Sequence, residues 1–350
     1  MKKFFLKISV IGLFFMGILL LKMHYDTFNV FHWQNIRFTS AQPNENFVKT
    51  QYIVHNPQKF NAFIFGSSRV GQLPAETLPK EADGIPLSWY NMTYPGGIPA
   101  EHSQTIRTLL KNGVGIRMVL LGFDNIAMYV SAEQRKKELI AMPFQVYEES
   151  PLRFYAPYLR NVPSPSIVLE VSRYKAAEKR EETELFYEYG GWTGCPTDFS
   201  LTENPQMERY ETGHFGYSQK EAHKDIEEII SLCSERGIRL VLFTNPLYQT
   251  LYRNSVEDGY FDFLRSVAQK CEFYNFSALN NYTTNPRYFF EWSHYRPALG
   301  LLVEKALFGT DEERENIRRE AGDALWGARV NAGNVEEIIA HLRRQIDDRN

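Results

Sequence analysis

The sequence has few cysteines and almost no net charge. Its 350 residues include three cysteines, Cys195, Cys233 and Cys271, without the CxxC or Cys/His spacing of a zinc site. Three cysteines cannot form a disulfide framework for so long a chain. The 39 basic and 42 acidic side chains give a net charge of −3, which removes the overall attraction that nucleic-acid-binding proteins normally have. These shortages exclude a structural metalloprotein, a disulfide-stapled toxin and a collagen, and they predict no nucleic-acid partner.

The composition is that of a folded chain with a substantial core. Hydrophobic residues make up 43% of the chain, aromatic residues 14% and charged residues 23%, which argues against disorder. A length of 350 residues allows one large domain or two small ones. No internal repeat or low-complexity tract interrupts it.

The N-terminus carries the longest apolar run. Residues 4–21 are apolar except for Lys7 and Ser9, and a run of 18 residues is just long enough to span a bilayer as a helix. Because Lys2 and Lys3 precede it, the positive-inside rule places the N-terminus in the cytoplasm. No small residues follow the run closely, as signal-peptidase cleavage requires. We therefore predict an uncleaved signal anchor over residues 1–24, a single-pass protein of the cell membrane, and a periplasmic or extracellular remainder. A cleaved signal peptide and a buried helix are the alternatives.

The location bears on the cysteines. Outside the cytoplasm Cys233 and Cys271 could be oxidised, which would leave one cysteine unpaired. Three buried thiols are the alternative reading of the same residues.

Short apolar runs alternate with helical patterns through most of the chain. Runs typical of buried strands occupy residues 61–65, 88–94, 116–121, 238–243 and 271–276. Helical spacing occupies residues 100–112, 219–236, 256–270 and 297–308. This alternation predicts an α/β fold, a three-layer sandwich with a mostly parallel five-stranded sheet covered on both faces.

Three segments depart from the alternation. Residues 25–60 form a polar juxtamembrane stretch, and residues 61–309 form the α/β domain. Within that domain, residues 130–218 are rich in Tyr, Pro and charge, which predicts an insertion over one end of the sheet, as a lid or substrate-facing subdomain. Residues 310–350 form a charged helical tail. Its amphipathic segment is expected to fold onto the domain through Val335, Ile338, Ile339, Leu342 and Ile346.

A serine follows the first predicted strand. In a parallel α/β sheet, ligands gather at the carboxyl ends of the strands. The sequence Gly66-Ser67-Ser68-Arg69 lies at such an end, where a glycine permits a tight exit from the sheet. A serine just beyond it can present its hydroxyl beside free backbone N–H groups, which stabilise negative charge. The same pattern is also a common helix cap.

A histidine follows the last predicted strand, in the sequence Glu291-Trp292-Ser293-His294. A carboxylate three residues before a histidine can hold one ring nitrogen and leave the other to deprotonate a serine. Two further strand ends offer hydrogen-bond donors for an oxyanion, from the sequences Pro95-Gly96-Gly97 and Gly122-Phe123-Asp124-Asn125.

In this order the motifs resemble those of the SGNH (GDSL-like) hydrolase superfamily. The resemblance is strongest to its membrane-anchored envelope members, related to the D-alanine transfer protein of teichoic acid synthesis and to alginate acetylation proteins. It implies a flavodoxin-like sheet over roughly residues 60–308, with the insertion outside the pattern. The family carries a Gly-Asp-Ser block, a glycine block, a Gly-x-Asn block and a late Asp-x-x-His block.

The resemblance assigns a role to each motif. It makes Ser68 the nucleophile, with Ser67 where the family has Asp, and His294 the base, with Glu291 where the family has Asp. Gly96 or Gly97 matches the glycine block. Asp124 stands where Asn is expected, with Asn125 next. A carboxylate at position 124 would repel an oxyanion unless it were protonated or turned away, so Asn125 or backbone groups would have to donate.

The resemblance implies a serine esterase or O-acyltransferase that acts through an acyl-serine on acyl esters of envelope polysaccharide. It needs no metal or organic cofactor, and it suggests a membrane-bound acyltransferase as a partner. The competing hypothesis is a catalytically inactive member that binds glycan or serves as a scaffold in the envelope.

Overall fold

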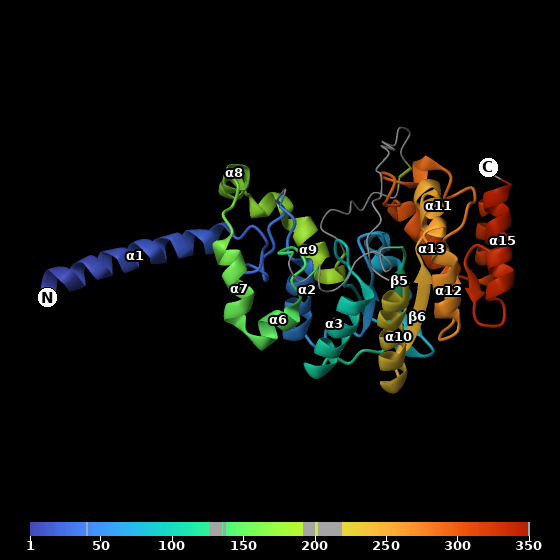
Figure 1. Ribbon diagram of the computed structural model, residues 1–350, viewed down its shortest axis with the longest axis horizontal. Coiled ribbons are helices and arrows are strands. Elements are labelled where there is room, and N and C mark those ends of the chain that lie inside the picture. The colour runs from blue at the N-terminus through green and yellow to red at the C-terminus, as the bar shows by residue number, and fades with distance from the viewer. Residues whose placement is uncertain (40, 126–134, 136–137, 192–199, 202–218, 349–350) are drawn as a thin grey trace.

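The computed structural model describes residues 1–39, 41–125, 135, 138–191, 200–201 and 219–348. Helix α1 (Lys2–Tyr25) projects from the body of the molecule, and the C-terminal helix lies at the opposite end (Figure 1). Its segment Phe4–Tyr25 is long and apolar enough to cross a membrane. The predicted membrane helix is therefore present as a helix that extends away from the folded part.

A six-stranded sheet forms the centre of the fold, in the order β4-β1-β5-β6-β7-β8. Its first five strands are parallel to one another, and all five were expected from the sequence. They are β1 (Ala62–Phe65), β4 (Trp89–Asn91), β5 (Met118–Phe123), β6 (Arg239–Thr244) and β7 (Phe273–Asn275). The carboxyl ends of β1, β4, β5 and β6 consequently open onto one edge of the sheet.

The sixth strand was not expected. Strand β8 (Ala328–Val330) pairs antiparallel with β7, with Phe273 opposite Val330, so the expected count of five strands is one too low. Three residues are too few to show an alternating pattern. The strand exists because the sheet edge at β7 offers backbone partners, which lie far away in the sequence.

The helices agree with the expected pattern except at one position. Helices α3 (Pro99–Lys111), α10 (Gln219–Glu235) and α13 (Pro297–Phe308) lie where the spacing predicted them. The expected helix over residues 256–270 is instead two helices, α11 (Gln249–Glu257) and α12 (Tyr260–Ala268). Gly259 separates them in the left-handed conformation, with φ of 92°, which a glycine adopts without strain.

The C-terminal segment is part of the main core. Helices α14 (Asp311–Ala321) and α15 (Val335–Asp347) flank β8. The amphipathic face of α15 is buried against the domain, as the sequence predicted, through Val335, Ile338, Ile339 and Leu342. Residues 310–348 therefore complete the sheet and its core.

A second core joins the juxtamembrane segment to the insertion. Helix α2 (Glu45–His55) packs against α6 (Phe144–Glu149), α7 (Pro151–Arg160) and α9 (Arg180–Tyr189) of the insertion. The insertion also contains α8 (Pro165–Arg173), which contacts α1. The buried residues of this second core are Val30, Ile36, Phe47, Val48, Met142, Phe144, Phe154, Tyr158 and Phe186. Figure 1 shows the helices that contribute to this second core, α2, α6, α7 and α9, between α1 and the sheet. The helices of residues 144–189 thus connect α1 to the α/β body.

Smaller elements complete the described chain. A ribbon pairs β2 (Glu81–Ala82) with β3 (Ile85–Pro86), and short 3₁₀ turns occupy 70–72, 75–77, 176–179 and 286–288. At the β4 edge of the sheet, Asn91 forms a parallel bridge with Gly190, and Gly191 N–H donates to Asn91 O at 3.0 Å. Cys233 is buried and Cys271 half-buried, both as free thiols, and Cys195 lies outside the described residues.

Candidate active site

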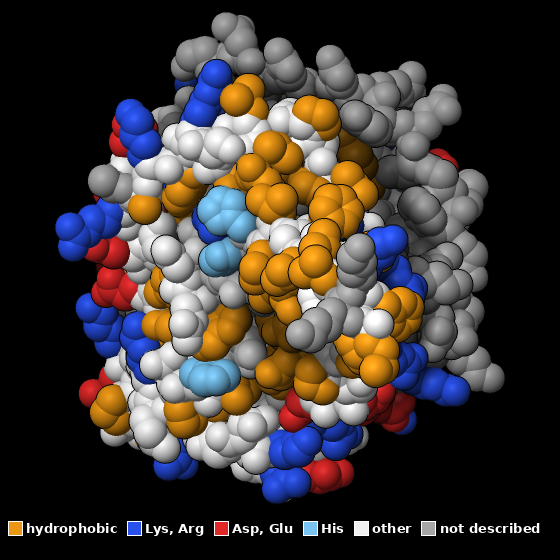
Figure 2. All heavy atoms as spheres, turned by 90° about the vertical axis from the view of Figure 1, so that its left-hand side faces the viewer, with side chains coloured by type: hydrophobic (Ala, Val, Ile, Leu, Met, Phe, Trp, Pro, Cys, Tyr) orange, Lys and Arg blue, Asp and Glu red, His pale blue; other side chains and the backbone are white. Residues whose placement is uncertain are grey.

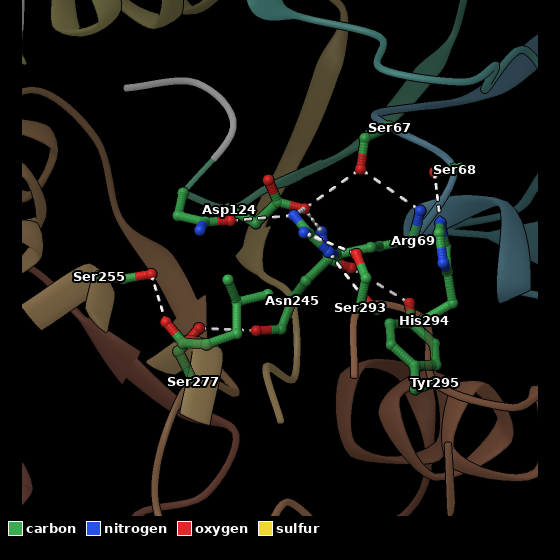
Figure 3. Close-up of polar contacts among 12 residues, drawn as sticks. Ser67, Ser68, Arg69, Asp124, Asn245, Ser255, Ser277, Ser293, His294 and Tyr295 are labelled. Carbon is green, nitrogen blue, oxygen red and sulfur yellow. Dashed lines mark hydrogen bonds and ion pairs between the residues drawn. The ribbon is translucent and has the colours of Figure 1, made fainter. Parts of the chain in front are cut away.

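The structure brings Ser68 and His294 together. Ser68 Oγ lies 2.7 Å from His294 Nε2, although 226 positions separate the residues (Figure 3). Ser68 follows β1, and His294 precedes α13. The turn that carries the serine needs Gly66, whose φ is +150° and whose Cβ, if present, would lie 2.2 Å from Val70 Cγ2. Sequence reasoning named both residues, and the fold places them in hydrogen-bonding contact.

Glu291 holds the other side of the imidazole. Its Oε1 accepts a hydrogen bond from His294 Nδ1, and its two oxygens accept backbone N–H bonds from Ser293 (2.8 Å) and His294 (2.9 Å). Burial raises the pKa of Glu291, but these hydrogen bonds and the charge of His294 outweigh it and leave that pKa below its usual value. A carboxylate on Nδ1 fixes the ring with its proton there, so Nε2 carries the lone pair that can accept the serine proton.

Asp124 faces an arginine and not an open substrate site. Arg69 Nη1 lies 3.0 Å from Asp124 Oδ2, and both side chains are buried. The same guanidinium donates to Ser293 O and Ser293 Oγ, each at 2.9 Å, and to Asn125 Oδ1 at 2.9 Å. The expected conflict between the Asp124 carboxylate and an oxyanion is therefore avoided, because Arg69 neutralises the carboxylate. Arg69 also ties the serine loop to the histidine loop.

A second tether runs from Asp124 through the end of β6. Asp124 Oδ2 accepts from Ser67 Oγ at 3.1 Å and from Asn245 Nδ2 at 3.3 Å. Asn245 Oδ1 in turn accepts from Tyr295 Oη at 3.1 Å, and Ser277 Oγ donates to Asn245 O at 2.6 Å (Figure 3). Ser293 and Tyr295 are the two chain neighbours of His294. Arg69 binds the first and Asn245 binds the second, so the backbone that carries the imidazole is held on both sides. Asp124 is the acceptor that both tethers share.

Of the expected oxyanion donors, one is already used in a turn and the others are not. Gly97 N–H donates to Tyr94 O at 3.1 Å and so belongs to a turn. Its role is close packing, because a Cβ there would lie 2.6 Å from Gly66 O. Asn125 gives its Oδ1 to Arg69, which leaves its Nδ2 amino group as the donor. The backbone N–H groups of Ser68 and Gly96 donate to no other described residue.

A buried polar cluster lies behind Gly97. A Cβ at Gly97 would come within 2.9 Å of His102 Cε1, and His102 is buried. Burial, together with the charge of Arg135, lowers the pKa of His102 to about 3, so the ring is neutral. Burial likewise raises the pKa of Glu101 to about 7, against the opposing effects of Arg135 and of the hydrogen bond from Tyr94 Oη at 2.8 Å. His102 thus backs the glycine turn.

Sequence reasoning missed three residues of this arrangement. Arg69 stood inside the Gly-Ser-Ser-Arg motif, and its position beside the serine was the available signal. Asn245 follows a predicted strand, as Asp124 does, which was a weaker signal. Nothing in the sequence marked Ser293 as an acceptor for Arg69. Within the residues that the structure describes, no three His, Cys, Asp or Glu side chains converge as metal ligands.

No protein-family model matches the chain, and no curated protein matches it at a significant level.

Proposed function

We propose that this protein is a membrane-anchored serine esterase or O-acyltransferase, of the SGNH type that its motifs resemble. One observation carries the proposal, namely the chain of hydrogen bonds from Ser68 Oγ to His294 Nε2 and from His294 Nδ1 to Glu291. A hydroxyl, an imidazole and a carboxylate in this sequence form the arrangement that makes serine a nucleophile. The three-layer sandwich typical of that superfamily belongs to the same proposal.

In the first half of the reaction, Ser68 Oγ attacks the carbonyl carbon of an acyl ester while His294 Nε2 takes the serine proton. The charge that develops on the carbonyl oxygen is stabilised by N–H donors, for which we propose the backbone of Ser68 and Gly96 and the Asn125 amide. Collapse of the tetrahedral intermediate expels the alcohol, which receives the proton from His294. Glu291 stabilises the imidazolium that exists between the two proton transfers.

In the second half, an acceptor hydroxyl attacks the acyl-serine with His294 again as the base. Water as the acceptor gives hydrolysis, and a sugar hydroxyl gives transfer. The apolar helix α1 and the three lysines near its start support an outward-facing domain, where envelope polysaccharide is the acceptor or substrate. A membrane-bound acyltransferase that supplies acyl groups is the partner that this function would need.

A fluorophosphonate probe tests the proposal directly, because an activated serine displaces its fluoride and forms a stable phosphonyl-serine. The full chain in detergent is treated with the probe beside Ser68→Ala and His294→Ala. Ser88→Ala is the matched control, since Ser88 precedes β4 and lies at the opposite end of the sheet. Labelling of the wild type and of Ser88→Ala, but of neither site variant, supports the enzyme. A correctly folded wild type without labelling refutes it and favours a glycan-binding protein.

A further inference from the structure

The few exposed apolar side chains of the folded part are gathered where α1 enters it. Among the described residues beyond α1, four large apolar side chains are exposed, and three of them lie on or between α7 and α8. Leu152 is 78% exposed, Val162 76% and Leu169 49%. Single exposed apolar residues are ordinary, but three of four in one short segment are not. We call Leu152, Val162 and Leu169 the α7–α8 patch.

The end of α1 is fastened beside this patch. Lys22 Nζ donates to Leu159 O at 2.8 Å and to Asn161 O at 3.2 Å, at the C-terminus of α7. Just after α1, Asp26 accepts backbone N–H bonds from Val30 (3.0 Å) and Phe31 (2.8 Å). Helix α1 also contacts both α7 and α8. These bonds hold the loop between α7 and α8 at the level where α1 ends.

The length of α1 sets that level relative to a membrane. At 1.5 Å per residue, the apolar segment Phe4–Tyr25 extends over about 33 Å, which matches a hydrocarbon layer of about 30 Å. A membrane that α1 crosses therefore ends near Lys22 and Tyr25. Figure 1 shows α7 lying across the direction of α1, as a helix in the membrane surface does.

The charge of the segment fits the same surface. Between Ser150 and Lys175 there are four basic side chains and one acidic one. Two of the basic ones, Arg153 and Lys175, pair with Glu149 and Glu178 just outside the segment, which leaves Arg160 and Arg173 for contact with lipid. Basic residues beside apolar ones favour an anionic lipid surface. Figure 2 views the molecule from the side toward which α1 projects, so the apolar band at its centre includes the exposed side chains of α1 itself, and both basic and acidic side chains lie around that band.

We infer that the α7–α8 patch is a second membrane contact, which rests on the outer surface of the bilayer that α1 crosses. The inference depends on the proposed role of α1 as a membrane span, but not on the catalytic role of Ser68. With two contacts the folded part cannot pivot on α1, so the insertion lies against the lipid and the α/β body is held at a fixed distance from it.

Depth-dependent fluorescence quenching tests the inference. A fluorescent amino acid is placed at position 162, 169 or 311 of the full chain, in vesicles of phosphatidylcholine and phosphatidylglycerol with brominated acyl chains. Position 311 is the control, because the Asp311 side chain is fully exposed on α14. We expect severalfold stronger lipid quenching at 162 and 169 than at 311, with the reverse order for aqueous iodide.

Each other result overturns the inference in a distinct way. If iodide quenches the probes at 162 and 169 as strongly as the probe at 311, the α7–α8 patch is exposed to water and does not contact lipid. Protection of 162 and 169 from both quenchers shows a patch covered by protein, either a second copy or another partner. Release of the chain from vesicles by alkaline carbonate shows that α1 does not span, and it refutes the anchor independently of the patch.

Discussion

Removing the guanidinium of Arg69 separates the stability of the site from its reactivity. In Arg69→Met the side chain keeps its length but loses its charge and its donors. The Asp124 carboxylate, which is 1% exposed, would then keep its bonds from Ser67 and Asn245 but lose its charged partner. Breaking a buried ion pair in this way costs about 3–5 kcal/mol, and we expect that loss in the free energy of unfolding.

The reactivity of Ser68 should fall as well. Arg69 holds Ser293 through its carbonyl and its hydroxyl, and Ser293 adjoins His294. A catalytic group displaced by about 1 Å can cost about a hundredfold in rate, so fluorophosphonate labelling should slow by about that factor. Denaturant unfolding in detergent measures the first effect, and labelling kinetics measure the second.

A double variant decides between the two contributions. In Arg69→Met with Asp124→Asn the uncompensated charge is gone, so we expect most of the lost stability to return. The labelling rate should stay low, because the tether to Ser293 is still absent. A single variant within about 1 kcal/mol of the wild type, or a double variant that regains its labelling rate, would contradict the reasoning.

Three further perturbations give separate expectations. Glu291→Gln places an amide on His294 Nδ1 and favours the wrong tautomer, so labelling should slow on the order of 10³–10⁴-fold without loss of fold. Gly97→Ala pushes a methyl group against Gly66 O and His102, and we expect a loss of about 1–3 kcal/mol in unfolding free energy together with slower labelling. Burial raises the pKa of Glu304 to about 8 in the folded protein. The Glu304 carboxyl therefore loses its proton at lower pH in the unfolded chain than in the folded one. The wild type should therefore lose about 2.5 kcal/mol relative to Glu304→Gln between pH 5 and pH 7.

Their controls are simple. For Glu291→Gln, Glu312→Gln on the exposed surface of α14 should label like the wild type. For Gly97→Ala, Gly115→Ala should be neutral, because a Cβ there meets nothing within 4 Å. For Glu304, the hydrogen-bond partner is Thr77, whose Oγ1 donates to Glu304 Oε2 at 2.5 Å and lies 2.8 Å from Pro74 O. A difference between the two proteins that does not change with pH would contradict this account.

The sequence was informative wherever a local pattern sufficed. Five strands and helices α3, α10 and α13 followed from apolar runs that end at glycine or proline. The positions of Ser68 and His294 followed from the rule that parallel strands place their carboxyl ends at one edge. Their contact does not follow from strand order alone, because β5 and β6 lie between β1 and β7; helix α13, which follows His294, packs against residues 70–72, which follow Ser68.

The sequence was uninformative where a residue's structure depends on residues far away in the chain. The three residues of β8 form a strand only because β7 lies beside them. Asp124 was expected at the oxyanion, and its actual role depends on Arg69 and Asn245, which come from two other loops. The second core has the same origin, since no local signal pairs residues 28–48 with a helix more than 100 positions later.

The bridge between Asn91 and Gly190 closes the β4 edge of the sheet with a segment made much later in the chain. Until α9 is in place, the backbone N–H and C=O groups of β4 are open to any other extended chain, and such an edge is a template for aggregation. A methyl group at position 190 would lie 2.3 Å from Asn91 O and would keep the two segments apart. Because position 190 is a glycine, this segment can approach β4 closely enough to cover its edge. That cover limits edge-to-edge association between copies of the chain.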